Sequence, residues 1–358
     1  MPYCHNCGAK LDDDARFCPV CGTPVAPVSP VATSATPQRT SQGTRRTTFP
    51  LAGIVLIVIL IIAVIGLAIA FVPFYPVSVS QSNEAAASNV NTLRLVLNAD
   101  VANVNVLLKD LPGNQRAAVN VSATGWRGIF GTDRPLALGF KEDTSNLTLT
   151  YSVNVSRAEG WTIFNTLDVT CDVFVDPSVK LDITVRTETG SVTMNADREM
   201  VLQNLNLQAT TGSVVAIVKE GVNVSGGLSL QTTTGSVRLQ WDEVKISRSI
   251  PVNVMTTTGS AEVNITQSRQ LAGNVTLNAQ TTTGGVNFAM NIQNDVGARI
   301  AASTTLGGIN VQQSGFSGNQ APLQSSNYPA GSNFIVTLSA TTGGIDINAA
   351  YQLAGVRS

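Results

Sequence analysis

The chain has 358 residues, and its 22 Lys and Arg residues nearly balance its 23 Asp and Glu residues. The formal net charge of -1 gives no field that would attract nucleic acid, so bulk nucleic-acid binding is not expected. The chain has one histidine, His5, so Ser-His-Asp and His-ligated metal chemistry are excluded from the other residues. The composition therefore points away from most familiar enzyme designs.

The N-terminal segment, residues 1–24, carries a metal-binding cysteine pattern. It has two C-x2-C pairs ten residues apart, and a glycine follows each pair. Four thiolates at this spacing make a closed tetrahedral zinc site with no open position for catalysis. A redox pair or a disulfide is disfavoured, because no thioredoxin-like context is present and the cytosol is reducing. We expect one structural Zn²⁺ per chain, with these ligands: Cys4, Cys7, Cys18 and Cys21.

This segment, with its Phe-Cys-Pro-x-Cys-Gly half, resembles the short zinc ribbons at the N-termini of many prokaryotic membrane proteins. Its three consecutive acidic residues, 12–14, outnumber Lys10 and Arg16, so protein contact is a better expectation than nucleic-acid binding. The Pro/Ser/Thr-rich stretch 25–49 has few large apolar side chains and is predicted to be a disordered linker.

Residues 51–72 form an apolar run without a charge. At 1.5 Å per residue the run covers about 33 Å, enough for a bilayer core of about 30 Å. We therefore predict a transmembrane signal-anchor helix over residues 50–73. Arg39, Arg45 and Arg46 precede it, so the positive-inside rule predicts a cytoplasmic N-terminus and an extracellular C-terminal domain at the plasma membrane.

Beyond residue 181 the sequence repeats around a Thr-Thr-Gly turn or a close variant. The turn glycines stand at 190, 212, 235, 259, 284, 307 and 343, and a Gly/Ser/Asn-rich insertion near Ser314–Ser332, read as a loop, lengthens the last interval. Counted from each glycine, positions -7, -5, +2 and +4 are apolar in all seven repeats, and the residues between them are mostly polar. This alternation predicts a strand, a turn and a second strand with one buried face. Because one repeat cannot bury its face alone, a stacked array is expected.

Two mainly β architectures fit the repeats. A parallel β-solenoid of about seven coils of 22–25 residues over 181–350 explains why the turn itself recurs, since like positions would stack in ladders. The alternative is an antiparallel β-sandwich of hairpins, which needs no identity between turns. Residues 77–180 show weaker alternation and are predicted to be a β-rich first part or cap. Within them Cys171 lies on an apolar strand face and is predicted to be a buried thiol, with an intermolecular disulfide as the alternative.

The run Asp172-Val173-Phe174-Val175-Asp176-Pro177, followed by the strand pattern from Leu181 and by Thr189-Gly190-Ser191, is similar to the putative-adhesin family of membrane-anchored β-solenoids. The resemblance covers roughly residues 90–350. It implies the β-solenoid fold, but it identifies no ligand-binding residue.

We therefore expect a non-enzymatic, adhesin-like surface protein that binds glycan or protein through its extracellular repeats. The alternative is a transmembrane envelope sensor or scaffold whose zinc ribbon contacts a cytosolic protein. A β-helix carbohydrate lyase or hydrolase is disfavoured because the acidic residues are scattered along the repeats.

Overall fold

The structure is a computed structural model that describes residues 3–4, 6–10, 17–24, 51–70, 75–127, 134–158, 166–318 and 321–353, and within the helix the side chains of residues 55–64. The chain divides into two compact units, Met1–Leu67 and Ala68–Ser358. The predicted linker over residues 25–49 and His5 lie outside the described residues.

Helix α1 spans Leu51–Ala70. Its described side chains, residues 55–64, are exposed and cover about 15 Å of the helix axis, half of a bilayer core. Within the described part of the chain, no helix is long and apolar enough to cross a membrane. The predicted transmembrane span over residues 50–73 is therefore not supported by the structure.

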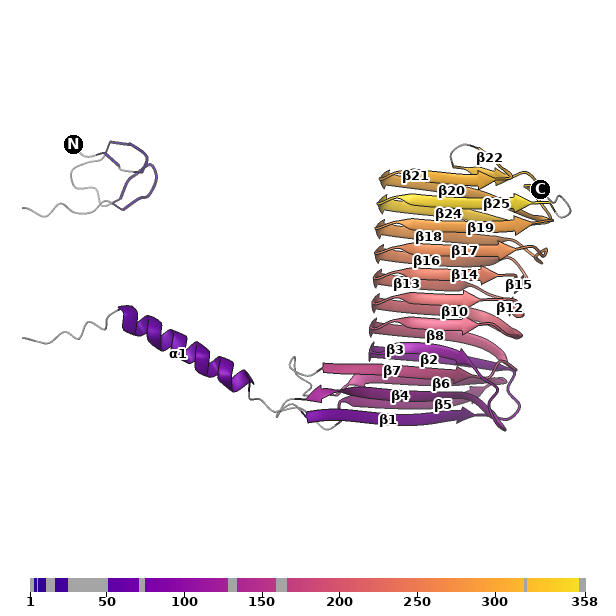
Figure 1. Cartoon of the computed structure of the whole chain (residues 1–358), viewed down its shortest axis with the longest axis horizontal. Coiled ribbons are helices and arrows are strands. Elements are labelled where there is room, and N and C mark those ends of the chain that lie inside the picture. The colour runs from indigo at the N-terminus through magenta and orange to yellow at the C-terminus, as the bar shows by residue number, and fades with distance from the viewer. Residues whose placement is uncertain are drawn as a thin grey trace, which may run out of the picture. The chain divides into compact units, whose positions relative to one another are not determined.

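The second unit consists of two large β-sheets whose strands stack in rows (Figure 1). The 11-stranded sheet has, in spatial order, β1 (Tyr75–Ala86), β4 (Gln115–Arg127), β7 (Thr166–Val175), β3 (Asn103–Leu108), β9 (Val192–Ala196), β11 (Val214–Val218), β14 (Val237–Asp242), β17 (Ala261–Gln267), β19 (Val286–Gln293), β25 (Ile345–Gln352) and β21 (Ile309–Ser314).

The 14-stranded sheet has, in the same manner, β22 (Phe316–Ser317), β23 (Leu323–Ser325), β20 (Val296–Leu306), β24 (Ser332–Thr342), β18 (Val275–Thr283), β16 (Ile250–Thr258), β13 (Leu228–Thr234), β10 (Met200–Thr211), β8 (Lys180–Thr189), β2 (Thr92–Val101), β6 (Thr148–Arg157) and β5 (Leu136–Ser145). Two short strands complete this sheet: β12 (Val222–Val224) pairs with β10, and β15 (Lys245–Ile246) pairs with β12.

Each Thr-Thr-Gly turn joins a strand of one sheet to a strand of the other sheet. Like positions of successive repeats pair in parallel, so Leu205 lies beside Leu228 and Leu228 beside Val252. The two strands that flank a turn therefore do not pair with each other, and the hairpin alternative is wrong. We name each repeat by its turn glycine.

The prediction of a regular parallel β-solenoid is correct only in part. The fold is mainly β, but both sheets are mixed, because β1, β4 and β5 at one end and β22 and β23 at the other pair antiparallel. The predicted loop near Ser314–Ser332 contains those last two strands. Antiparallel strands at the ends cover edges of the sheets that would otherwise be open.

The order of the repeats in space differs from their order in sequence. β24 lies between β18 and β20, and β25 between β19 and β21, so the Gly343 repeat is inserted between the Gly284 and Gly307 repeats. At the opposite end, β2 lies between β6 and β8 in one sheet. In the other sheet, β3 lies between β7 and β9. Residues 75–175 thus belong to the same two sheets as the repeats.

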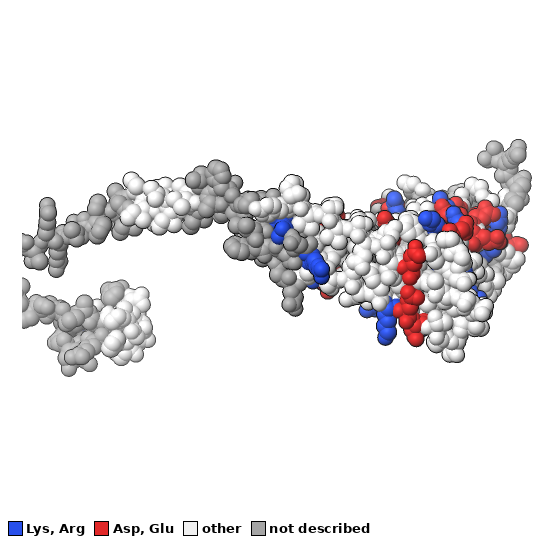
Figure 2. All heavy atoms as spheres, turned by 90° about the horizontal axis from the view of Figure 1, so that it is seen from below, with Lys and Arg blue, Asp and Glu red and all other residues white. Residues whose placement is uncertain are grey.

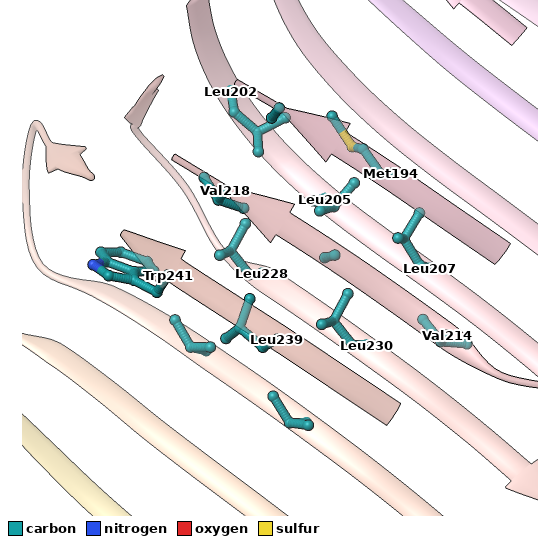
Figure 3. Close-up of a cluster of buried hydrophobic side chains, with 14 of the residues drawn as sticks. Met194, Leu202, Leu205, Leu207, Val214, Val218, Leu228, Leu230, Leu239 and Trp241 are labelled. Carbon is teal, nitrogen blue, oxygen red and sulfur yellow. The ribbon is translucent and has the colours of Figure 1, made fainter. Parts of the chain in front are cut away.

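The core lies between the two sheets, where side chains of β10 and β13 face those of β9, β11 and β14 (Figure 3). The apolar positions that define the repeats are all buried except three, and these three belong to one repeat: Ala302, Ile309 and Val311. Cys171 is fully buried and free, as the alternation predicts. Burial, followed by the nearby charge of Asp172, raises the pKa of this thiol to about 12.

Steric constraints explain why the turn residue is glycine in every repeat. Its φ lies between +132° and +150° in the seven repeats, a region that side chains disfavour. A Cβ on Gly235 would also stand 2.1 Å from the carbonyl oxygen of Gly212, and the same close approach recurs from repeat to repeat. The glycines therefore form a column in which each backbone packs directly on the next.

Candidate zinc centre and polar groove

Two similar loops build the N-terminal site. In the first, the Gly8 N–H donates to the Cys4 carbonyl at 2.9 Å, and in the second the Gly22 N–H donates to the Cys18 carbonyl at 2.9 Å. Both glycines have φ near +70°. Each tight turn therefore places the first and second cysteine of a pair on the same side of its loop.

The structure brings the four predicted ligands together. Their Sγ atoms lie within 4.8 Å of one another, and none forms a disulfide. Two separations are 3.5 Å, between Cys4 and Cys21, and 3.6 Å, between Cys7 and Cys18. A tetrahedral zinc ion with Zn–S bonds of about 2.3 Å requires S···S separations of about 3.8 Å. The cluster therefore fits one structural Zn²⁺, held by four thiolates with no position left for substrate.

The pKa values of two of the thiols are shifted in opposite directions. The hydroxyl of Thr23, 3.2 Å from Sγ, and then its backbone lower the pKa of Cys21 to about 6. A backbone hydrogen bond with Ala9 acts to lower the pKa of Cys7, but hydrogen bonds with the other three thiols and desolvation outweigh it and raise this pKa to about 12. Thiols that share one site cannot all ionise without a cation, so zinc binding releases the remaining protons.

The second unit carries a polar groove on the outer face of its 14-stranded sheet, with a volume of about 470 Å³. The groove crosses six neighbouring strands in the order β2, β8, β10, β13, β16, β18. One row of side chains is in strict register, and it consists of Asn98, Arg186, Gln208, Gln231, Met255 and Gln280. A second row of lining residues lies two positions before the turn glycines, and it consists of Glu188, Thr210, Thr233, Thr257 and Thr282. The groove therefore offers amide and hydroxyl groups at intervals of about 4.8 Å.

Buried threonines support this surface from below. The Thr232 hydroxyl donates to the Gly212 carbonyl at 2.8 Å, and the Thr256 hydroxyl donates to the Gly235 carbonyl at 3.0 Å. In the amide row, the Gln231 amide donates to the Ser229 hydroxyl at 3.0 Å. These contacts hold the turn column and the groove wall in place.

Sequence reasoning identified the polar character of this face but not the groove. The signal was the recurrence of an amide four residues before the turn glycine, at Gln208, Gln231 and Gln280. To find the groove one also needs the parallel register, which places residues from separate repeats side by side.

Comparisons with known proteins find solved structures that are similar to most of the chain and a domain family that matches its N-terminal segment. A crystal structure of a putative cell adhesion protein from Clostridium sporogenes is 12% identical, covers 76% of this chain and 99% of its own, and has a TM-score of 0.36. A putative adhesin from Bacteroides fragilis is 11% identical, covers 75% of this chain and 97% of its own, and has a TM-score of 0.33. No curated protein matches the chain. Residues 3–25 match the zinc-ribbon domain family, so the N-terminal segment is a zinc ribbon with one structural zinc, as predicted.

Proposed function

We propose that this protein is a non-enzymatic, adhesin-like surface protein that binds an extended, neutral glycan in the polar groove of its β unit. The observation that carries the proposal is a row of six side chains in register across six strands, four of them amides, beside a second row that contains four threonines. A linear glycan presents hydroxyl groups at a similar regular spacing. From β10 to β18 each sugar would therefore meet a threonine hydroxyl, and beside every strand except β16 also a glutamine amide.

The charge of the groove favours a neutral ligand. Its charged lining residues lie at one end, where Asp100 and Glu188 outnumber Arg186. From Gln208 to Gln280 the lining residues are uncharged. A strongly acidic polymer would meet repulsion at one end and no compensating cation at the other.

The protein is proposed to bind the glycan without cleaving it. Glycoside hydrolysis usually requires two carboxyl groups that flank the scissile bond. Asp100 and Glu188 come from adjacent strands at one end of the groove, and Arg186 lies with them. We expect bound polysaccharide to remain intact. If the protein instead produced new reducing ends, and a Glu188→Gln variant did not, the proposal that the protein is not an enzyme would be contradicted.

The apolar run over residues 51–72 is proposed to anchor the chain in the plasma membrane, with the ribbon in the cytoplasm and the β unit outside. The run is long enough for a bilayer, and the arginines at 39, 45 and 46 precede it. Four residues of the sequence separate α1 from β1.

One experiment tests the topology and the ligand separately. Intact cells that produce the full chain with an epitope after Ser358 are mixed with antibody, which cannot enter cells, and with beads that carry a neutral polysaccharide. We expect antibody labelling and bead binding, and a loss of bead binding of at least about tenfold in a Gln208→Ala/Gln231→Ala variant. The matched control is Gln240→Ala, on the other sheet.

Cells without antibody labelling would contradict the topology. Labelled cells that bind no beads, or variants that bind equally, would contradict the glycan site.

A second function, protein contact by the zinc ribbon, is favoured by one specific observation. Three large apolar side chains of this small domain are exposed, Tyr3 by 66%, Phe17 by 64% and Val20 by 73%. Contact surfaces are commonly built from exposed apolar side chains that lie together, and these three would supply such a patch. If the ribbon is cytoplasmic, it would bind a cytosolic protein and give the chain the role of a sensor or scaffold. Loss of a captured partner in a Tyr3→Ser/Phe17→Ser variant that still binds zinc is the result expected, and unchanged capture would contradict it.

A further inference from the structure

The Gly307 repeat is the last repeat at one end of the β unit. Its strand β20 is followed by β23 and β22, its strand β21 is an edge strand, and its inward-facing side chains are incompletely covered. Ala302 and Val311 are half-buried and Ile309 is 39% exposed, whereas the same positions are buried in every other repeat. The residue before the turn glycine is Thr in the other six repeats and Leu306 here, where it is 66% exposed. This end therefore presents apolar groups that its neighbours bury.

The same end has an unpaired strand edge. Within the described residues β21 pairs only with β25, so its other side is open. The Ile345 N–H donates to the Gly308 carbonyl, so Gly308 and each second residue after it direct their backbone groups toward β25. Ile309, Val311 and Gln313 then direct theirs outward. Three residues thus offer unsatisfied donors and acceptors in one line.

Nothing on this edge discourages pairing. Proteins usually protect edge strands with charges, proline or bulges. Residues 300–314 contain no charged residue and no proline. By contrast, the edge strands at the opposite end carry Pro76 and Glu84 in β1, and Lys141, Glu142 and Asp143 in β5. That end faces the viewer in Figure 2 and shows both acidic and basic side chains.

We propose that the open edge is a self-association surface, in which β21 pairs antiparallel with β21 of a second copy of this chain. A two-fold axis through the middle of the strand would let each outward N–H meet a carbonyl of the partner. Leu306 and Ile309 would contribute apolar contact beside this new ladder. The two 11-stranded sheets would become one continuous sheet.

The charge pattern explains why the occupant is the same end of another copy. Pairing β21 with the charged edge β5 would bring Lys141, Glu142 and Asp143 against a surface with no opposite charge to match them. Two neutral β21 edges have no such mismatch. Within the described residues, only the end with β21 has an edge strand without charge or proline. Association therefore stops at a closed dimer and does not continue into a filament.

The test uses the full-length, zinc-loaded chain in detergent micelles. Sedimentation gives the protein mass as a function of concentration, and amide hydrogen exchange reports the edge. We expect a monomer–dimer equilibrium in which the amides of Ile309, Val311 and Gln313 become protected as the dimer forms and lose this protection on dilution. A Gln312→Lys variant places like charges across the two-fold axis and should weaken association by about tenfold or more.

The matched control is Asn348→Lys, because Asn348 lies beside Gln312 on the neighbouring, interior strand. This variant should retain the dimer, since its charges stand one strand further from the axis on each side. A chain that is monomeric at all concentrations would overturn the proposal. A dimer that survives Gln312→Lys and leaves the three amides unprotected would also overturn it, because the helix or the ribbon would then hold the dimer.

Discussion

At the scale of single residues, the chain uses cysteine in two opposite ways. In the ribbon, Cys7 and Cys21 are exposed and all four thiols converge, so their chemistry is metal binding. Cys171 is enclosed between the sheets, where burial holds its pKa near 12 and keeps it protonated. Both roles could be predicted from sequence, because C-x2-C spacing defines a metal site and an alternating apolar strand defines a buried position.

A thiol titration should therefore separate the two classes. With a thiol reagent at pH 8, the zinc-loaded chain should react slowly, and a chelator should make the four ribbon thiols reactive. The fifth should react only after denaturation, since about one molecule in 10⁴ carries a Cys171 thiolate at that pH. A Cys171→Ser variant is the control and should lose only the fifth equivalent. Five reactive thiols in the folded, chelated chain would show that Cys171 is accessible.

At the scale of the elements, the repeated turn is explained by contacts between repeats. The buried threonine hydroxyl donates to a glycine carbonyl of the adjacent repeat, and the glycine leaves room for that carbonyl. The strand pattern, the buried face and the need for stacking could all be predicted from the alternation of apolar residues. The spatial order of the repeats could not be predicted, because the Gly343 repeat has the same inward-facing pattern as every other repeat and its insertion depends on tertiary pairing.

Adjacent glycines provide a direct test of the turn column. Gly284→Ala places a Cβ 2.0 Å from the Gly259 carbonyl at a φ of +136°, whereas Gly285→Ala meets only Gly344 O at 3.4 Å and has no positive φ. We expect Gly284→Ala to lower the free energy of unfolding by about 2–5 kcal/mol. The Gly285→Ala control should change it by less than about 1 kcal/mol. Chemical denaturation measures both, and equal effects would show that the column tolerates a side chain.

At the scale of the whole molecule, the zinc ligands were predictable but the groove and the open end were not. Ligand identity and spacing are local properties of the sequence, so the four cysteines could be assigned directly. The groove arises only when parallel register brings Gln208 beside Gln231, and the open end only when the Gly307 repeat becomes terminal. In the sheet order, β1 and the proposed pairing edge β21 are the two ends of the 11-stranded sheet.

The two units should also respond separately to loss of zinc, because each has its own buried cluster. The ribbon's cluster centres on Cys4 and Cys18, and such small domains unfold without their metal. The core of the β unit contains no ribbon residue. A chelator with reductant should therefore abolish the tetrathiolate absorption of a cobalt-substituted chain while the melting temperature of the β unit moves by less than about 2 °C. A Cys18→Ser variant should behave like the chelated chain. A fall of many degrees in the β-unit transition on chelation would show that the ribbon stabilises the sheets.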